Sequence, residues 1–305
     1  MQYDKSTCFA SPLDYETLLC HAEVLCDTYE SVSLSYIGNS LLSRKIPMLC
    51  FGEGEGRSVF YIAGHHASEW LCGCVLLHFL YDIAECEKNF KTVYGINPYY
   101  IRKNRKIYVV PSLNVDGIEI QIHAVSDENP LKDRILRANG GEDFTHWQAN
   151  ARGVDLNHNY NAGFEQYKRL ELEAGIVGSA PTRYSGEYPE SEPEVSAVCN
   201  FLRYTAPSLI LTLHSQGEEI FGGNITKVKN GLRLGRRISD MTSYKLCEAD
   251  GFAAYGGLSD WYTDEMRLPS FTLECGKGEN PLPLSDGEGI YARLRRALFT
   301  LPATV

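Results

Sequence analysis

The sequence has few of the features that would assign it at once to a specialised class of protein. Its 29 lysine and arginine residues are outnumbered by 39 aspartate and glutamate residues, which gives a formal net charge of −10. A nucleic-acid-binding protein is expected to have a basic face, so this balance argues against a nucleic-acid partner. No apolar run approaches the ~20 residues needed to span a bilayer, and we therefore expect no membrane partner.

Targeting and cysteine patterns are also missing. The stretch that follows Met1 to Lys5 has no apolar core of the kind found in signal peptides, so we expect a cytoplasmic protein. The ten cysteines include no CxxC pair, which argues against a cysteine-based zinc cluster. We expect the thiols to stay reduced and to pack as small hydrophobic side chains, since most of them lie in apolar runs.

The rest of the sequence is that of an ordinary globular protein, with 44% hydrophobic and 22% charged residues. It contains no internal repeat, low-complexity tract or linker. Short apolar segments alternate with longer segments of helical composition, which is typical of a parallel sheet covered by helices. We therefore predict one α/β domain over residues 1–305, with a central mixed, largely parallel sheet and helices on both faces. Residues 1–57 are expected to supply an N-terminal helix and edge strands.

The expected elements follow from apolar periodicity and turn residues. We expect strands at 32–37, 47–51, 58–63, 107–110, 209–213 and 270–273. We expect helices at 13–29, 70–84, 191–204, 226–246 and 289–301, of which 191–204 begins with a capping box formed by Ser191 and Glu194. Residues 95–106 are expected to form a polar connection. The stretch 163–190 lacks clear periodicity, and loops of this length are usually functional or mobile, so whether it covers a site stays open here.

Polar residues follow three of the expected strands. His66 and Glu69 come after 58–63, His214 comes after 209–213, and Glu274 comes after 270–273. Open α/β sheets bind ligands at the carboxyl ends of their strands, and a charge leaving a buried strand is costly unless it is paired or bound to a metal. Two histidines and one carboxylate form a catalytic zinc arrangement with a position left open for water. The alternative for the His-x-x-Glu pattern alone is an acidic helix start beside a polar turn.

Motifs in a fixed order resemble the zinc metallocarboxypeptidase family. They are Gly-His-His-Ala-Ser-Glu-Trp at 64–70, Leu-Asn-Val-Asp-Gly at 113–117, Arg-Gly-Val-Asp-Leu-Asn-His-Asn at 152–159, Leu-His-Ser at 213–215 and Thr-Leu-Glu-Cys-Gly at 272–276. Residues 147–157 and 274–283 look most like the bacterial γ-D-glutamyl-L-diamino acid endopeptidases, which act on peptidoglycan stem peptides. The resemblance implies a zinc peptidase with one Zn²⁺ per chain.

The resemblance also implies roles for individual residues. His66, Glu69 and His214 match the family's three zinc ligands, and Asp155 matches an aspartate that fixes the tautomer of a ligand histidine. A turn aspartate is the alternative for Asp155. His65 is out of phase with the ligands, so we expect a structural or rim histidine.

Two further positions match the reaction chemistry of the family. Glu274 matches the general base, which takes a proton from the attacking water. Arg152 lies near the place of an arginine that polarises the scissile carbonyl and stabilises the oxyanion; a surface ion pair is its alternative. The family's mobile tyrosine is expected before Asp260-Trp261. Ungapped spacing puts Phe252 there, and we choose Tyr255, three residues later.

One departure from the family pattern concerns the substrate's terminal carboxylate. Typical exo-acting members place an arginine after the asparagine that matches Asn157, and the two hold that carboxylate. Here the next residue is His158, which cannot form the arginine fork. Trimming of ordinary C-terminal residues is therefore in doubt, whereas cleavage before a diamino acid is compatible with the change. Arg183 is a candidate to bind the substrate's carboxylates, with a solvated loop charge as the alternative.

The function that follows is hydrolysis of an amide bond in a small, cell-wall-derived peptide, at a γ-D-glutamyl–diamino acid bond. Three alternatives remain at this point. They are a carboxypeptidase acting on ordinary C-terminal residues, a zinc-dependent deacylase of small N-acyl amino acids, and a non-enzymatic protein that binds muropeptides. A panel of substrates distinguishes them, because a deacylase spares peptides and a binding protein hydrolyses none of them.

Overall fold

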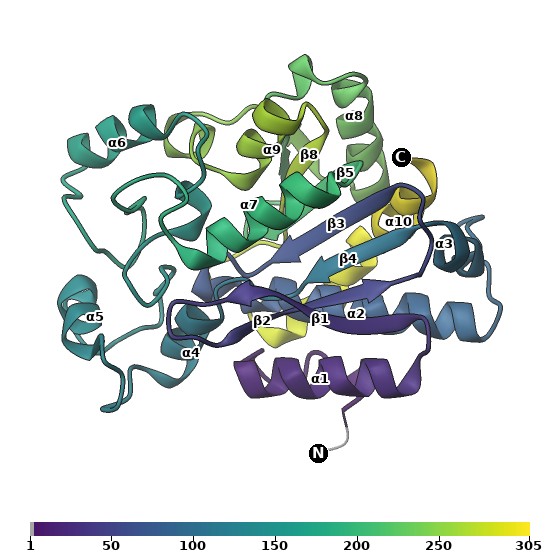
Figure 1. The fold of residues 1–305 in the computed structure, drawn as a ribbon, viewed down its shortest axis with the longest axis horizontal. Helices are drawn as coiled ribbons and strands as arrows, with labels where there is room; N and C mark the ends of the chain where they lie inside the picture. The colour runs from purple at the N-terminus through teal and green to yellow at the C-terminus, as the bar shows by residue number, and fades with distance from the viewer. Residues whose placement is uncertain (1–2) are drawn as a thin grey trace.

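The computed structural model describes residues 3–305, and its centre is a mixed sheet of eight strands within those residues (Figure 1). The strand order is β1-β2-β4-β3-β5-β8-β6-β7. The strands are β1 (Val32–Asn39), β2 (Lys45–Phe51), β3 (Ser58–Ala63), β4 (Lys106–Val110), β5 (Leu209–His214), β6 (Glu219–Phe221), β7 (Lys245–Cys247) and β8 (Ser270–Glu274).

The middle of this sheet is parallel and its flanks are antiparallel. Strands β4, β3, β5 and β8 run parallel to one another, whereas β1 and β2 pair antiparallel with each other and β2 pairs antiparallel with β4. At the other edge, β6 is antiparallel to β8 and parallel to β7. Nearly every residue of β3 and β5 is buried, as expected for strands covered on both faces. The predicted fold class is confirmed.

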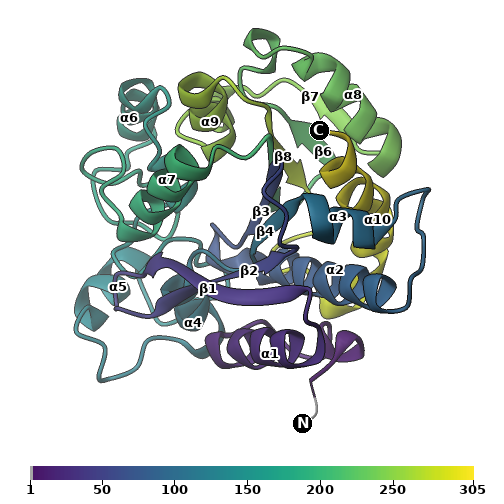
Figure 2. The ribbon, with the colours of Figure 1, turned by 45° about the vertical axis from the view of Figure 1, so that its right-hand side comes forward.

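Helices cover both faces of the sheet (Figure 2). On one face α2 and α10 pack against β3, and on the other face α9 packs against β8 while α7 packs against β1. The helices of residues 3–305 are α1 (Tyr15–Thr28), α2 (Trp70–Lys88), α3 (Pro98–Asn104), α4 (Val115–His123), α5 (Lys132–Asn139), α6 (Phe164–Glu173), α7 (Pro193–Thr205), α8 (Gly231–Thr242), α9 (Leu258–Met266) and α10 (Gly287–Thr304).

Helix α2 corrects one expectation about apolar runs. Among the described residues, the segment Ala67–Lys88 is long and apolar enough, by length and composition alone, to cross a membrane, with a mean hydropathy of 1.2. Of the window that passes this test, 94% is buried inside the structure, because α2 packs between the sheet and α10. Such burial is typical of the core helix of a globular domain.

Several elements were not expected from the sequence. Helix α3 lies in the expected polar connection 95–106, and α6 occupies part of the long stretch 163–190. Helices α4, α5 and α9 and the short strands β6 and β7 were also missed. The predicted capping box is wrong: Glu194 accepts from the backbone N–H of Leu41 instead of reaching back to Ser191, and α7 begins without a side-chain cap.

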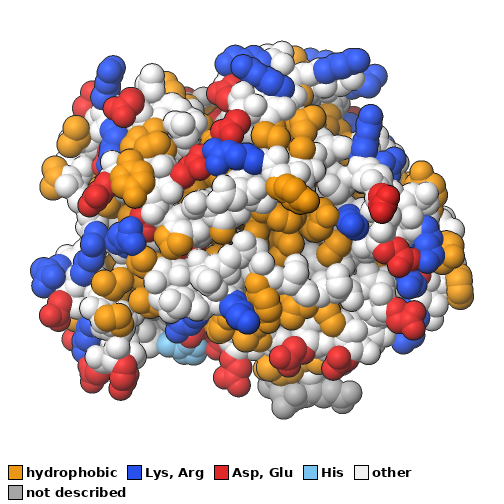
Figure 3. Space-filling model, in the orientation of Figure 1, with side chains coloured by type: hydrophobic (Ala, Val, Ile, Leu, Met, Phe, Trp, Pro, Cys, Tyr) orange, Lys and Arg blue, Asp and Glu red, His pale blue; other side chains and the backbone are white. Residues whose placement is uncertain are grey.

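The charged surface and the cysteine side chains have the distribution that the composition predicts. On the face shown in Figure 3, acidic and basic side chains are interspersed, with basic ones gathered over α8. The cysteines are all free, and most are buried, which confirms the expectation that most pack as small hydrophobic side chains.

The three parallel strands that matter most for function end at one edge of the sheet. Strand β3 leads into Gly64 and the turn that carries His66, while β5 and β8 end side by side at His214 and Glu274, which face each other in the strand register. Gly64 has a positive φ of 68°, and a Cβ there would come within 3.0 Å of the Ser112 backbone. Only glycine fits this close approach without strain.

Candidate metal and active site

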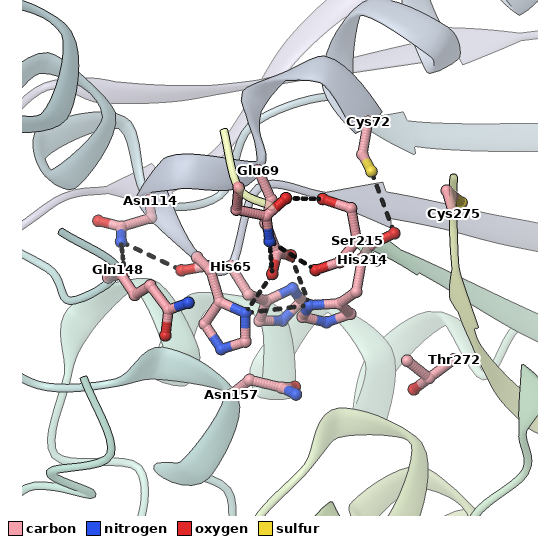
Figure 4. A network of polar contacts seen from close by, with 12 residues as sticks. His65, Glu69, Cys72, Asn114, Gln148, Asn157, His214, Ser215, Thr272 and Cys275 are labelled. Atoms are coloured by element: carbon pink, nitrogen blue, oxygen red, sulfur yellow. Dashed lines mark hydrogen bonds and ion pairs between the residues drawn. The ribbon is translucent and has the colours of Figure 1, made fainter. Parts of the chain in front are cut away.

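His66 and Glu69 meet His214 at this edge, although His214 comes from a distant part of the chain. Figure 4 shows Glu69 beside His214. One carboxylate oxygen of Glu69 lies 2.9 Å from Nδ1 of His66, and the other lies 2.9 Å from Nδ1 of His214. The two Nδ1 atoms are 3.3 Å apart. His66 precedes the short 3-10 turn that holds Glu69 and leads into α2, and His214 ends β5, so rigid elements hold all three ligands.

The donor set fits a zinc ion. Nitrogen and oxygen ligands at 2.0–2.2 Å in a tetrahedron lie about 3.3 Å from one another, and the two Nδ1 atoms are separated by 3.3 Å. The two Nδ1 atoms and the carboxylate of Glu69 are therefore close enough together to bind one shared cation. A two-histidine, one-carboxylate set with space beside it is the ligand pattern of catalytic zinc.

The charges around His66 and Glu69 also favour a cation between these side chains. Burial disfavours the charged form of His66, but the carboxylates of Glu69 and Asp155 outweigh it and hold the pKa of His66 well above its usual value. Burial likewise disfavours ionised Glu69, yet His66 and His214 lower the pKa of Glu69 to about 2. Positive charge is therefore stabilised between these side chains.

Further side chains hold the ligands in place. Asp155 lies 3.1 Å from Nε2 of His66 through Oδ1, and its Oδ2 accepts from the backbone N–H of Arg183. The amide of Asn280 donates to the carbonyl oxygen of Ser215 at 2.7 Å and lies 3.4 Å from Oε1 of Glu69. These contacts fix the orientation of His66 and Glu69 before any ligand arrives.

His65 is a structural histidine rather than a rim residue. It is fully buried, its Nε2 lies 2.8 Å from the hydroxyl of Tyr160, and its ring stacks on that of His214 at 5.3 Å. Burial holds the pKa of His65 well below its usual value, so the side chain is neutral and supports a neighbouring ligand.

Glu274 stands at the end of β8, directly beside His214 in the strand register. It is half-buried and lines the same cavity as His66 and Glu69. Burial, together with the like charges of Glu69 and Glu219, raises the pKa of Glu274 to about 7 despite the opposing effect of the histidines. A carboxylate with a pKa near the working pH is suited to accept and return a proton.

Two cavities meet at this group. The first, of about 530 Å³, is lined by His66, Glu69 and Glu274 together with polar side chains of the 146–148 and 215–219 segments. The second, of about 600 Å³, shares His66 and Glu274 and extends toward α8 and α9. The reacting groups therefore stand between two spaces, each large enough for part of a small peptide.

Comparison with known proteins identifies the family. The family model of zinc carboxypeptidases matches residues 22–303. The chain belongs to the zinc carboxypeptidase family. Gamma-D-glutamyl-L-diamino acid endopeptidase 1 of Lysinibacillus sphaericus is 30% identical over 281 residues, which are 91% of this chain and 69% of that protein. The family assignment makes this zinc carboxypeptidase a metallopeptidase with one zinc ion that acts on peptide substrates.

Solved structures have the same fold. The structure of thrombin activatable fibrinolysis inhibitor matches with a TM-score of 0.72 and 20% identity, over 98% of this chain and 77% of that chain. The murein-tripeptide amidase MpaA from Escherichia coli O157 matches with a TM-score of 0.54 and 19% identity, over 88% of this chain and 91% of that chain. At these identities the likeness concerns the fold alone.

The structure of this zinc carboxypeptidase places Arg152 away from the cavity that holds the metal group. Its guanidinium pairs with buried Glu192 at 3.3 Å, and it lines a separate small cavity with Arg134 and Tyr184. The role of an oxyanion-stabilising arginine is therefore not supported at this position, and the alternative, an ion pair, describes it. Oδ1 of Asn150 accepts from the backbone N–H of Arg152.

The predicted substrate-binding residues lie around the second cavity. Asn157, His158 and Tyr255 line it, and Nδ1 of His158 lies 3.0 Å from the carbonyl oxygen of Tyr255. Burial lowers the pKa of His158, which favours the neutral ring. A neutral ring cannot supply the positive charge that an arginine would carry at this position. Phe252, the other candidate position for the mobile aromatic residue, lines the same cavity.

Arg183 contacts the site through both its backbone and its side chain. Its backbone N–H holds Asp155, while its exposed guanidinium lies 5.0 Å over the ring of Phe252, at the rim of the second cavity. The segment around it is tied to the site, since the carbonyl oxygen of Pro181 accepts from the backbone of Gln148. The backbone of this part of the stretch 163–190 is thus hydrogen-bonded to Asp155 and Gln148.

Several polar residues of the two cavities were not predicted from the sequence, and three of them bear on the proposals below. Gln148 and Asn280 line the first cavity, and Asp260 lines the second. A signal existed for Gln148 and Asn280, because both lie within the segments 147–157 and 274–283 that resemble the endopeptidases. Asp260 had served only as a landmark for the mobile tyrosine.

Proposed function

We propose that this member of the zinc carboxypeptidase family hydrolyses γ-D-glutamyl–diamino acid bonds in peptidoglycan-derived peptides. The observation that carries a hydrolytic role is the convergence of His66, Glu69 and His214 with Glu274 beside the same cavity. The finer substrate is supported by 30% identity to a γ-D-glutamyl-L-diamino acid endopeptidase and by the chemistry of the second cavity.

The protein's own residues supply the proton transfers. Zinc, when held by His66, Glu69 and His214, acts as a Lewis acid that polarises the carbonyl and lowers the pKa of water. Glu274 accepts a proton from the water that attacks the carbonyl carbon, and it returns the proton to the nitrogen as the C–N bond breaks. Two cavities that meet at Glu274 allow the peptide to be held on both sides of that bond.

The second cavity favours a substrate with an extra ammonium group. Asp260 lines it from the first turn of α9, and burial together with the like charge of Asp264 raises the pKa of Asp260 to about 7. No cation contributes to this shift. The second ammonium of a diamino acid would provide one, and it would favour the ionised form of Asp260. Neutral His158 in the same cavity suits an exo-acting carboxypeptidase poorly.

We further propose that the protein is cytoplasmic and acts on recycled cell-wall fragments. The free, mostly buried cysteines support a reducing compartment. Fractionation of the native host, with detection of the protein by antibody, tests the location independently of the substrate.

The experiment uses the zinc-loaded protein and a panel of defined substrates. We expect it to cleave L-Ala-γ-D-Glu-meso-diaminopimelate between the D-glutamate and the diamino acid, with the products identified by mass spectrometry. Cleavage of ordinary C-terminal residues only would instead make it a carboxypeptidase, and release of acyl groups from N-acyl amino acids only would make it a deacylase. Tight muropeptide binding with no hydrolysis of any substrate would make it a binding protein.

Asp260→Asn tests the role of the second cavity. We expect this variant to raise KM for the diaminopimelate peptide by about 10-fold or more. The KM for a peptide that carries alanine in place of the diamino acid should change little. Asp264→Asn is the matched control, because Asp264 lies one turn further along α9 and pairs with Asn224 and Lys227 instead. Equal losses on both peptides, or an equal loss in Asp264→Asn, would contradict the assignment.

A further inference from the structure

The proposed hydrolysis places a negative charge on the carbonyl oxygen of the attacked amide, and the structure leaves that charge without the arginine expected from the sequence. Among residues 3–305, neither of the two cavities is lined by a lysine or an arginine. Oxyanions are commonly stabilised by neutral amide donors as well as by cations. A side-chain amide of the first cavity that is free to donate could therefore stabilise the negative oxygen.

We propose that the side-chain amide of Gln148 is the protein's hydrogen-bond donor to this oxyanion. When water adds to the amide carbon, a C–O bond forms and the π electrons of the carbonyl move onto its oxygen. The N–H of Gln148 then shares that charge through a hydrogen bond. When the C–N bond breaks, the electron pair returns to form the new carboxyl group, and the nitrogen leaves with the proton that Glu274 carries. The inference rests on the peptidase activity of the proposed function.

The backbone of Gln148 is fixed directly to the metal-binding turn. Its carbonyl oxygen accepts from the backbone N–H of Ala67 at 3.0 Å and from the side chain of Asn114 at 3.1 Å. Ala67 directly follows His66, and Asn114 also donates to the carbonyl oxygen of His65. The position of Gln148 relative to the ligands is therefore set by hydrogen bonds to the same turn that carries them.

The side chain of Gln148 is oriented by Thr182. The hydroxyl of Thr182 donates to Oε1 of Gln148 at 2.6 Å. The other acceptor near that hydroxyl, Oδ2 of Asp155, is 3.5 Å away and already accepts from the backbone N–H of Arg183 at 2.9 Å. With its oxygen bound to Thr182, the amide directs Nε2 away from that contact, and Figure 4 shows the side chain reaching toward the histidine rings.

Four other polar side chains of the first cavity are less suited to the role. The amide of Asn280 donates to the carbonyl oxygen of Ser215, and the hydroxyl of Ser215 donates to Asn280 in return. His146 is exposed and its Nδ1 lies beside the carbonyl oxygen of Asn280. Gln216 is exposed, so water competes for its amide. Gln148 is half-buried, and its amide nitrogen is free to donate a hydrogen bond to the substrate.

Two substitutions of Gln148 separate donation from shape. Gln148→Met keeps the length of the side chain and removes its N–H groups, and Gln148→Glu keeps the shape and replaces the amide donor with a carboxylate. We expect kcat to fall by about 10²–10³-fold in both variants, with KM and zinc content close to those of the parent protein. Gln166→Glu, an exposed position on α6, makes the same change in charge and should leave kcat unchanged.

A binding measurement tests the same donor without turnover. A phosphinic pseudopeptide that mimics the tetrahedral state should lose affinity in Gln148→Met by the same factor as kcat/KM, whereas a cleavage product should bind as before. Thr182 is the positioning residue, so Thr182→Val should lower kcat and Thr182→Ser, which keeps the hydroxyl, should restore it.

Failure of this inference is distinct from failure of the proposed substrate. If the parent protein cleaves some other peptide in the panel, the Gln148 variants are compared on that peptide and the substrate proposal alone is lost. A kcat within about threefold of the parent in both Gln148 variants would overturn the inference, as would equal losses of affinity for the product and the tetrahedral mimic. A fall in kcat in Arg152→Gln with none in Gln148→Met would return the role to Arg152.

Discussion

The Nε2 atom of His66 lies 3.1 Å from Oδ1 of Asp155, a fully buried carboxylate that is 89 residues further along the chain. Burial works against ionised Asp155, but His66, His158 and the backbone N–H of Arg183 outweigh it and hold the pKa of Asp155 well below its usual value. An ionised carboxylate only accepts hydrogen bonds, so the proton of neutral His66 sits on Nε2 and its Nδ1 is left to bind the metal.

Asp155→Asn is expected to weaken zinc binding by about 10–100-fold. The amide can present its N–H to Nε2 and so favour the wrong tautomer of His66, and it removes the negative charge that stabilises the metal-bound arrangement. Competition with a chromogenic chelator measures the affinity. Asp143→Asn is the matched control, since exposed Asp143 also accepts a backbone N–H two residues further on. Equal zinc affinities of Asp155→Asn and the parent protein would contradict this role.

Glu274→Gln is expected to lower kcat by about 10²–10⁴-fold, because the amide cannot accept the proton of the attacking water. Zinc content should stay near that of the parent protein, since Glu274 is outside the His66–Glu69–His214 group. Steady-state kinetics together with elemental analysis of the same samples checks both statements. Glu173→Gln, at an exposed position on α6, serves as the control, and full activity in Glu274→Gln would show that another group is the base.

Zinc removal is expected to destabilise the folded protein, because the ion binds the native arrangement of His66 and Glu69 with His214, which is distant in the sequence. A metal at a free concentration of 100 times its Kd adds about 2.7 kcal/mol to the free energy of unfolding, so chelation should lower the Tm and added zinc should restore it. Differential scanning calorimetry with and without chelator measures the change.

The number of bound ions tests which group holds the metal. A second set of side chains, Asp14, Glu119 and His123, also lies within 4.8 Å of one another, but it is partly exposed. We expect one tightly bound zinc per chain, lost in His214→Asn and kept in His123→Asn. Loss of the ion in the His123 variant and not in the His214 variant would reverse the assignment.

The positions of the central strands and the convergence of the ligands could be predicted from the sequence because both depend on local patterns. Strands such as 58–63 and 209–213 are mostly apolar, and a ligand residue follows each of them closely in the sequence. Parallel strands end at one edge, so His66, His214 and Glu274 had to meet there once those strands were recognised. The structure brings them together as expected.

The errors concern side chains whose partners are distant in the sequence. Arg152 lies near the place of the family's arginine in the sequence, but its guanidinium pairs with Glu192, 40 residues away. The side chain of Gln148 is oriented by Thr182, 34 residues away, and no local sequence pattern predicts that contact. Helix α6 was missed because it is amphipathic over only ten residues, Phe164–Glu173, a length at which periodicity gives a weak signal.

Glu194 should make the stability of the protein depend on pH. It is fully buried in the first turn of α7, where Oε1 accepts from the backbone N–H of Leu41 and Oε2 has no partner among the described residues. Burial, with smaller contributions from Asp116 and Glu192, raises the pKa of Glu194 to about 7 from a model-compound value of 4.5. Between these two pH values the folded protein therefore binds more protons than the unfolded chain.

The contribution of Glu194 to the free energy of unfolding is thus present in full below pH 4.5, falls as the pH rises toward 7, and is constant above it. Glu194→Gln keeps an oxygen for Leu41 and cannot ionise, so it should gain stability relative to the parent protein at pH 8, by up to about 3 kcal/mol. Urea unfolding at several pH values between 5 and 8 measures the difference between the two proteins. Glu165→Gln, exposed in the first turn of α6, should leave the profile unchanged. Parallel profiles for the parent protein and Glu194→Gln would mean that Glu194 does not titrate in this range.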